Sequence, residues 1–355
     1  MFWVAAGAAL ACGFPISGSE YSIDEGGIAS SSGGNGLVAL DPQVRTIVEA
    51  FAGEDEVCAS AFVGACMGAL ADCGASSGCV DYSVCMRERA APTAETTCSD
   101  DGDTSVEDSW RFELVRHCWA SRYAECDLGR NFECVGEYGP PSGERTVAEV
   151  RQQVLLRGAE SAGSDFTISF CPEWSDCSEP IVEVAANRVT GVYDATLPVG
   201  GKNFGVGNEW RGYRLVRGPD VPDSIVAANT PIWGRRVEIT RLLSTAQVGA
   251  VSFWYGADIE SSVLVQIVDC LSDPAPGVTF ELPTSASESI TYVDGEGSRV
   301  PGPTVASGAA GISGYDPEEL QTIRAARGGE TLATWSGELS AGKPRYLRLH
   351  PMGSR

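Results

Sequence analysis

The spacing of apolar residues divides the chain into a helical first part and a β-rich second part. Asp41 followed by Pro42 is typical of a helix start, and apolar residues then recur at helical spacing as far as Phe51. The same spacing predicts further helices over 57–70, 79–87 and 110–126, with a small-residue break at 74–78 and a polar loop at 98–108. We therefore predict a helical hairpin bundle over residues 37–138.

After residues 140–141 the pattern changes to short alternating apolar segments separated by Gly and Pro. These segments predict strands at 166–170, 181–185, 189–197, 210–216, 236–240, 263–268, 278–282, 289–293, 331–335 and 346–349. Ser244 predicts the N-cap of a short helix that reaches about Tyr255. Short strands at regular intervals are typical of β-sandwich modules, so we expect one over 147–256 and another over 257–355.

The amino terminus is an apolar run of small residues that ends at Cys12, which predicts part of a secretory signal. Ala9-Leu10-Ala11-Cys12 resembles the lipobox of bacterial lipoproteins. The resemblance implies a lipid on Cys12 and, because Gly13 follows it, a place in the outer membrane or on the cell surface. We expect residues 1–12 to be the signal with the lipidated Cys, and the Gly- and Ser-rich residues 13–36 to be a flexible tether.

Thirteen cysteines are many for 355 residues, and none are arranged in the two-residue spacing that zinc or iron–sulfur sites use. Disulfides are the better interpretation, and they indicate an oxidising compartment. Without Cys12, nine cysteines fall at 58–134 and three at 171–270. Full pairing therefore needs at least one bridge between the two regions. The predicted disulfide cysteines are Cys58, Cys66, Cys73, Cys79, Cys85, Cys98, Cys118, Cys126, Cys134, Cys171, Cys177 and Cys270.

The charge balance is acidic, with 25 basic and 48 acidic side chains and a net charge of −23. Such a field repels phosphate backbones, so we expect no nucleic-acid partner. The acidity otherwise indicates a soluble, well-hydrated surface.

Three local patterns suggest chemistry, and each has a simpler structural interpretation. The sequence from Gly74 to Gly78 matches the G-x-S-x-G elbow of hydrolases, but it lies in a small-residue turn between two cysteines instead of after a strand. The acidic residues Asp100, Asp101, Asp103, Glu107 and Asp108 could hold calcium, although their spacing differs from an EF-hand loop. His117 could activate Cys118, but a disulfide is the commoner fate of such a cysteine. We therefore assign no catalytic residue, metal ligand or cofactor.

The segments from Val265 to Cys270 and from Pro274 to Phe280 resemble the first two strands of a carboxypeptidase-regulatory-like, or transthyretin-like, sandwich. Residues 308–311 stand where that family has a Gly-bearing turn, and residues 166–243 resemble a diverged copy in which Cys171 and Cys177 could bridge a turn. The arrangement is similar to surface lipoproteins of gliding Gram-negative soil bacteria. The resemblance implies immunoglobulin-like accessory modules without catalytic residues.

The predicted fold class is mainly β with a small α segment: two immunoglobulin- or transthyretin-like sandwiches after a disulfide-rich helical hairpin bundle. The expected function is a non-enzymatic, lipid-anchored surface module for adhesion, binding or spacing. Its expected partners are the membrane, through the anchor, and a carbohydrate or envelope protein. Aromatic side chains that could stack on sugars are Trp174, Trp210, Trp233, Trp254 and Tyr255. Two alternatives remain open: a carbohydrate-active or other hydrolase that uses carboxylates, and a thiol redox or metal-buffering protein.

Overall fold

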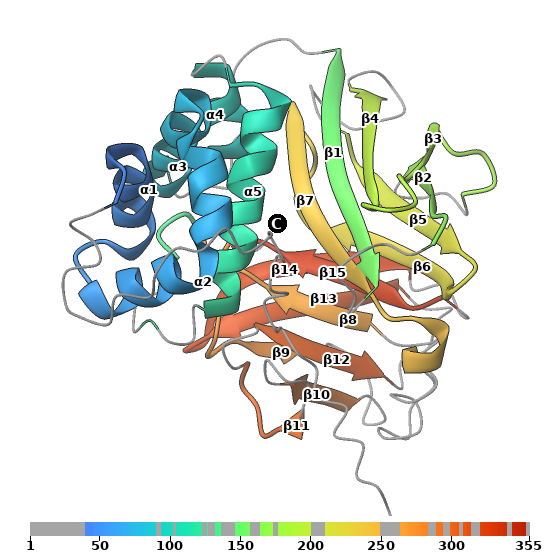
Figure 1. Cartoon of the computed structure of the whole chain (residues 1–355). Coiled ribbons are helices and arrows are strands. Elements are labelled where there is room, and N and C mark those ends of the chain that lie inside the picture. Colours follow the sequence, from blue (N-terminus) through green and yellow to red (C-terminus); the bar gives the residue numbers. More distant parts are fainter. Residues whose placement is uncertain are drawn as a thin grey trace, which may run out of the picture.

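A computed structural model describes most of the chain between residues 40 and 352 (Figure 1). The described ranges are 40–89, 94–101, 104–122, 126, 132–135, 146–156, 164–172, 177–199, 210–248, 263–282, 289–293, 299–304, 308–313, 320–338 and 343–352. Cys12, the tether and the expected sugar-stacking residues Trp174, Trp254 and Tyr255 lie outside them. Helices α1 to α5 precede all the strands in the chain.

The helices are α1 (Pro42–Ala52), α2 (Glu56–Gly74), α3 (Ser77–Arg89), α4 (Ala94–Asp101) and α5 (Val106–Arg122). The strands up to residue 242 are β1 (Val147–Leu156), β2 (Thr167–Pro172), β3 (Val182–Ala185), β4 (Val192–Pro198), β5 (Gly212–Gly218), β6 (Val221–Ala228) and β7 (Arg235–Leu242). The later strands are β8 (Val263–Ile267), β9 (Thr279–Glu281), β10 (Ser289–Val293), β11 (Arg299–Val300), β12 (Ala309–Ser313), β13 (Leu320–Arg327), β14 (Glu330–Glu338) and β15 (Arg345–Leu349).

Side-chain caps begin the first two helices. The Asp41 carboxylate accepts a hydrogen bond from the Gln43 N–H at 2.9 Å, and Pro42 occupies the first turn of α1, as the sequence predicts. Asp55 caps α2 in the same way, because its carboxylate accepts from the N–H groups of Val57 and Cys58. The capped ends satisfy backbone donors that would otherwise lack partners.

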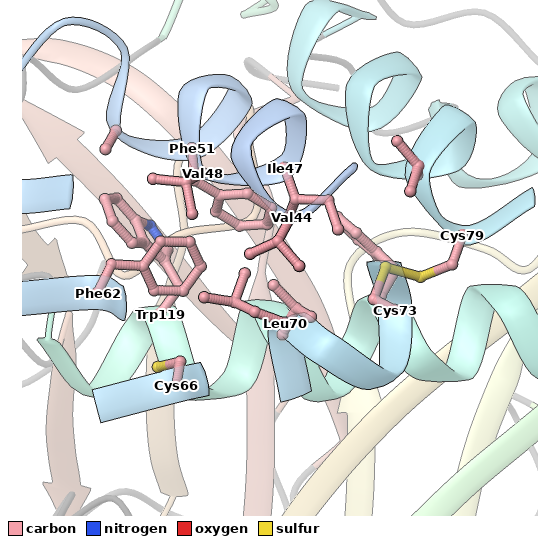
Figure 2. Close-up of a cluster of buried hydrophobic side chains, with 14 of the residues drawn as sticks. Val44, Ile47, Val48, Phe51, Phe62, Cys66, Leu70, Cys73, Cys79 and Trp119 are labelled. Atoms are coloured by element: carbon pink, nitrogen blue, oxygen red, sulfur yellow. A yellow bond between two sulfur atoms is a disulfide. The ribbon is translucent and has the colours of Figure 1, made fainter. Parts of the chain in front are cut away.

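The helices form a bundle around an aromatic core (Figure 2). The rings of Phe51 and Phe62 lie 5.6 and 4.8 Å from the Trp119 ring, and all three side chains are buried. Leu70 fills the space beside them from α2. By length and composition alone α2 could cross a membrane. Its buried face, however, packs into this core in the manner of a core helix of a folded domain.

Six disulfides use every cysteine in the described residues. Four lie within the helical part, one joins Cys171 of β2 to Cys177, and one joins the two regions of the chain. The pairs are Cys58–Cys126, Cys66–Cys118, Cys73–Cys79, Cys85–Cys98, Cys171–Cys177 and Cys134–Cys270. Disulfide bonding and the inter-region bridge agree with the cysteine arithmetic.

The described strands form one nine-stranded sheet and two three-stranded sheets. The large sheet has the order β11-β10-β12-β8-β15-β6-β5-β2-β3, and the small sheets are β4-β1-β7 and β14-β13-β9. The last strand, β15, lies between β8 and β6 and is parallel to both. The two predicted modules therefore share one continuous sheet, which the sequence did not suggest.

Each small sheet packs against one half of the large sheet. Val150 and Val154 of β1 share a core with Ile168 and Phe170 of β2. A second core is formed where β9, β13 and β14 meet β8, β12 and β15. The predicted fold class, mainly β with a small disulfide-rich helical segment, is confirmed.

Several boundaries differ from the prediction for identifiable reasons. The expected polar loop at 98–108 contains part of α4, which the Cys85–Cys98 disulfide fixes beside α3. The helix expected after Ser244 is described over 245–248. Its start is a capping box, in which the Gln247 N–H donates to the Ser244 hydroxyl and the Ser244 N–H donates to the Gln247 side chain.

We predict that the inter-region disulfide contributes more stability than a short-loop disulfide. Cys134 and Cys270 are 136 positions apart, whereas Cys73 and Cys79 are 6 apart. Loop-closure entropy gives about 5 kcal/mol for the first pair and about 2 kcal/mol for the second. The double variant Cys134→Ser/Cys270→Ser should therefore lose more free energy of unfolding than Cys73→Ser/Cys79→Ser, as measured by urea unfolding without reductant. All four cysteines are buried, so the comparison is matched; equal losses would contradict it.

Candidate functional site

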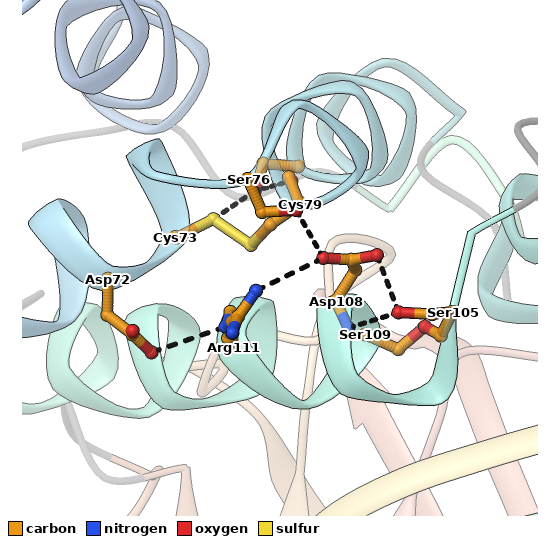
Figure 3. Close-up of a disulfide and its surroundings, with 9 residues drawn as sticks. Asp72, Cys73, Ser76, Cys79, Ser105, Asp108, Ser109 and Arg111 are labelled. Carbon is orange, nitrogen blue, oxygen red and sulfur yellow. Dashed lines mark hydrogen bonds and ion pairs between the residues drawn. A yellow bond between two sulfur atoms is a disulfide. The ribbon is translucent and has the colours of Figure 1, made fainter.

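The hydrolase-like pentapeptide forms the turn between α2 and α3 (Figure 3). The Cys73–Cys79 disulfide closes this turn, and the Ser76 hydroxyl donates to Asp108 Oδ1 at 2.5 Å. The Ser76 carbonyl accepts from the Val80 N–H, which starts α3. A hydrolase elbow requires a strand before the serine, whereas a helix precedes this one. The pattern therefore has a structural role here.

Of the acidic residues proposed as calcium ligands, Asp108 and Glu107 are engaged by protein groups. Asp108 accepts from the hydroxyls of Ser76 and Ser105 and lies 3.5 Å from Arg111 (Figure 3). Although partial burial raises its pKa, these hydrogen bonds bring the net pKa of Asp108 below its ordinary value. Glu107 pairs with Arg151 at 2.6 Å. Within the described ranges, no group of three potential ligands is placed to hold a metal ion.

His117 and Cys118 do not form a reactive pair. Cys118 is bonded to Cys66, so its sulfur is not a thiolate. Burial and, to a smaller extent, the nearby charge of Arg241 together lower the pKa of His117 to about 3. At neutral pH the imidazole is uncharged and has no free thiol beside it.

Two of the aromatic side chains expected on the surface are in the interior. Trp210 and Trp233 are 3% and 2% exposed, and the Trp210 ring lies 5.7 Å from Phe170. They serve as core residues of the first sandwich half, so the expectation that they could stack on a sugar is corrected.

A partly open cavity of about 40 Å³ lies where α4 and α5 face β7 and β15, and it was not apparent from the sequence. Seven Glu, Arg and His side chains line it, together with Tyr82, Met86, Ser109, Phe112, Val237 and Ser272. The seven are Glu95, Glu113, Arg116, Arg236, Glu238, Arg348 and His350. We call these seven residues the ionic cluster.

The helix side of the ionic cluster begins with a bidentate pair on α5. Arg116 donates to Glu113 through Nε at 2.7 Å and through Nη2 at 2.5 Å. Its Nη1 crosses to the loop after β8 and donates to the Ser272 carbonyl at 2.8 Å. Both side chains are buried, so this pair connects α5 directly to the sheet region.

The strand side is organised around Glu238 on β7. Its carboxylate lies 3.1 Å from Arg214 on β5 and 3.4 Å from Arg348 on β15, and it accepts from the Gln152 amide at 3.3 Å. Burial alone would raise the pKa of Glu238, but the guanidinium groups of Arg214, Arg348 and Arg236 bring it down to about 2. Glu238 is therefore ionised throughout the physiological range.

Glu95 on α4 behaves in the opposite way. It pairs with Arg236 Nε at 3.4 Å and accepts a hydrogen bond from the Val237 N–H. Burial nevertheless raises its pKa to about 7, with the charges of Glu113 and Glu238 adding to the effect. The pKa values of the two carboxyls in one cavity are thus shifted in opposite directions from the ordinary value for glutamate.

A neighbouring ion pair adds to the same interface. Arg87 of α3 contacts the fully buried Asp273 at 2.7 Å, and its guanidinium lies over the Phe51 ring at 4.6 Å. The Trp119 indole N–H also reaches Asp273, at 3.4 Å. The aromatic core of the bundle is therefore connected to the loop after β8.

The chemistry of this arrangement favours docking over catalysis. The carboxylates of Glu113, Glu238 and Glu95 each lie beside a guanidinium. The guanidinium groups around Glu238 keep it ionised, which removes it from proton transfer at neutral pH. The contacts join α4 to β7 and α5 to the loop after β8, and they also join β7 to β5 and β15. The ionic cluster thus fixes the bundle against the strands.

Comparison with known proteins gives no family for the chain. No protein-family model matches, and no curated protein matches. Among solved structures, the TIE protein of Bacillus anthracis is 12% identical, with 59% of this chain and 34% of that chain covered and a TM-score of 0.17. The shaft pilin SpaA of Lactobacillus rhamnosus GG is also 12% identical, with coverages of 59% and 99% and a TM-score of 0.19. This chain spans about a third of the first protein, and scores this low carry no argument about fold or function.

We predict that the buried Arg214–Glu238 pair is far more costly to break than an exposed pair. Arg214→Met removes one guanidinium from Glu238, and breaking a buried pair costs about 3–5 kcal/mol. Arg324→Met is the matched control, because Arg324 contacts Glu281 at 2.7 Å but the side chains are 43% and 50% exposed. That change should cost at most about 1 kcal/mol. Urea unfolding of both variants checks the difference, and similar losses would contradict the assigned role.

We also predict a pH dependence that belongs to Glu95. Its pKa is about 7 in the folded state against an ordinary value of 4.5, so the folded state binds more protons between these limits. The contribution of Glu95 to the free energy of unfolding is therefore fully present at low pH and is lost as pH rises toward 7. The total loss is on the order of 3 kcal/mol. Glu95→Gln removes that loss. The free energy of unfolding, measured from pH 4.5 to 7.5, should fall more steeply for the wild type; parallel profiles would refute the assignment.

Proposed function

We propose that the protein is an exported, lipid-anchored protein of the cell envelope whose folded body serves in binding, adhesion or spacing and carries no catalysis of its own. The observation that carries the proposal is the pairing of all twelve cysteines after Cys12 in six disulfides. Such usage belongs to oxidising compartments outside the cytosol. The lipobox-like sequence at Cys12 and the Gly- and Ser-rich residues 13–36 supply the anchor and the tether.

The rigidity of the body supports a mechanical or binding role. The Cys134–Cys270 disulfide and the ionic cluster join the helical bundle to the nine-stranded sheet. The two sandwich halves are in turn joined by β15, which pairs with β6 and β8. Because its parts cannot move relative to one another, such a body would hold a binding surface at a fixed distance from its anchored end. The proposed partner is a carbohydrate or an envelope protein.

The alternatives have less support in the described residues. A thiol redox or metal-buffering role needs thiolates, whereas each of the twelve cysteines is bonded to another. A hydrolase that uses carboxylates needs an accessible acid–base pair. The carboxylates of the cavity are instead buried against Arg116, Arg214 and Arg236.

Mass spectrometry of membrane-extracted protein tests the anchor and the disulfides together. Before reduction, iodoacetamide should label no cysteine, and after reduction it should label the twelve bonded ones while Cys12 carries lipid. Cys12→Ser should move the protein from the membrane fraction to the soluble fraction and leave the six disulfides intact. Ser17→Ala, in the tether, is the control and should stay in the membrane fraction. A reduced, soluble wild-type protein would refute the proposal.

A further inference from the structure

The loop after β8 carries a peptide bond with unusual surroundings, between Asp273 and Pro274. The Asp273 carboxylate is fully buried. Its Oδ2 atom accepts from Arg87 Nη1 at 2.7 Å and from the Trp119 indole N–H at 3.4 Å. Its Oδ1 atom is also buried and accepts no hydrogen bond from any residue that the structure describes. One carboxylate oxygen is therefore held in place while the lone pairs of the other stay free.

The main chain of Asp273 is fixed by Asp269, at the other end of the same loop. The Asp269 N–H donates to the Asp273 carbonyl oxygen at 2.8 Å. The Asp269 carboxylate in turn accepts from the N–H groups of Asp273 and Leu271, at 3.0 and 2.9 Å. An N–H placed at this distance stabilises negative charge that develops on a carbonyl oxygen during attack on its carbon. The carbonyl carbon of Asp273 is therefore prepared for a nucleophile.

The residues on either side of Asp273 also favour opening of the bond. Ser272 has a φ of 64°, in the left-handed region that residues other than Gly rarely adopt, and such strain is relieved when the chain is cut beside it. Pro274 forms a tertiary amide, whose nitrogen carries no N–H and is a more basic leaving group than that of a secondary amide. The loop therefore combines a free carboxylate oxygen, a polarised carbonyl and a good leaving group at one bond.

We propose that the protein cleaves its own chain between Asp273 and Pro274. Oδ1 of Asp273 attacks the main-chain carbonyl carbon of the same residue, and the new C–O bond closes a cyclic anhydride. The C–N bond to Pro274 breaks, and its electron pair stays on the proline nitrogen, which takes a proton from mildly acidic solvent. Water then opens the anhydride and leaves Asp273 with its side-chain carboxyl and a new terminal carboxyl. One water molecule is consumed in total, as in any peptide hydrolysis.

The groups that face the loop supply water and charge stabilisation. Ser272 lines the partly open cavity, so water reaches the residue next to the bond. The Ser272 carbonyl accepts from Arg116 of α5 at 2.8 Å and from Arg348 of β15 at 3.2 Å, and Arg87 of α3 holds the carboxylate of Asp273. These cations keep the loop in place and favour the negative charge of the tetrahedral intermediate.

The two pieces would stay together in the folded protein. All thirteen cysteines lie before the bond, so no disulfide crosses it. The second piece contains β9 to β15, of which β12 and β15 pair with β8, and β15 also pairs with β6. Denaturation would therefore separate the pieces even without reductant. Each chain reacts once and takes no external substrate, so the inference is independent of the lipid anchor and of any surface partner.

Incubation of the full-length protein at mildly acidic pH, folded and in urea, tests the proposal. Denaturing gels without reductant and intact mass spectrometry should show pieces that end at Asp273 and begin at Pro274. Cleavage there should be about a hundredfold faster in the folded protein, the contribution of roughly one oriented N–H donor. The Asp41–Pro42 bond is the internal control, because Asp41 is exposed and its Oδ1 atom already accepts from Gln43; folding should not accelerate its cleavage. Slower cleavage after Asp273 in the folded protein than in urea would overturn the proposal.

Two further measurements identify the mechanism. Pro274→Ala keeps the Arg87–Asp273 pair but replaces the tertiary amide, so cleavage should be lost, whereas Pro42→Ala should retain it. In water enriched in heavy oxygen, the label should appear in both carboxyl groups of Asp273, because water can open the anhydride at either carbonyl. Label confined to the terminal carboxyl would indicate direct hydrolysis or a contaminating protease and overturn the proposal, even if Pro274→Ala fails to fold.

Discussion

The need to pair charge that has been removed from water governs how the two parts of this protein meet. The helical bundle has an apolar core of its own, and each sandwich half has another. The surface between them is instead lined by guanidinium and carboxylate groups. A buried ion requires a partner in good geometry, so each charged residue at this surface restricts the relative position of two elements. Docking is thus specified by charge pairing more than by apolar contact.

The polar interface also explains an unusual position in β1. Gln152 is fully buried on a strand whose neighbouring inward positions are Val150 and Val154. Its amide oxygen accepts from Tyr193 and Arg214, and its amide nitrogen donates to Glu238. An isolated buried amide would be destabilising, whereas one with three partners links β4, β5 and β7 into a single network. The ionic cluster therefore extends from the helices deep into the first sandwich half.

Local features of the sequence predicted local structure well. The Asp41–Pro42 pair identified the start of α1 because capping depends only on neighbouring residues. The cysteine count predicted a bridge between the two regions because each region contains an odd number of cysteines, whatever its fold. In contrast, β1 was missed since Gln152 interrupts its apolar alternation, and α4 was missed since its polar sequence is held helical by contacts from elsewhere. The joining of two predicted modules through β15 is equally a long-range property that periodicity does not reveal.

The cavity was missed for the same reason, because its members come from α4, α5, β7 and β15. One signal was present in the sequence: Arg236 and Glu238 stand two positions apart in a predicted strand and therefore point to the same face. Opposite charges in that arrangement are ordinary on an exposed face. They became informative only when the structure placed the face against α4 and α5, so burial, not composition, identifies the site.

The Cys134–Cys270 disulfide compensates for the weakness of an ionic interface. Charge pairs gain less than apolar contacts from exclusion of water, and water that enters such an interface can hydrate both partners. A covalent link keeps the separated parts at high effective concentration, so that an opened interface closes again as an intramolecular step. The bridge leaves from residue 134, just after the last described part of the bundle, and ends at residue 270, beside Ser272 and Asp273. It therefore lies close in the chain to Ser272 and Asp273, which Arg116 and Arg87 contact.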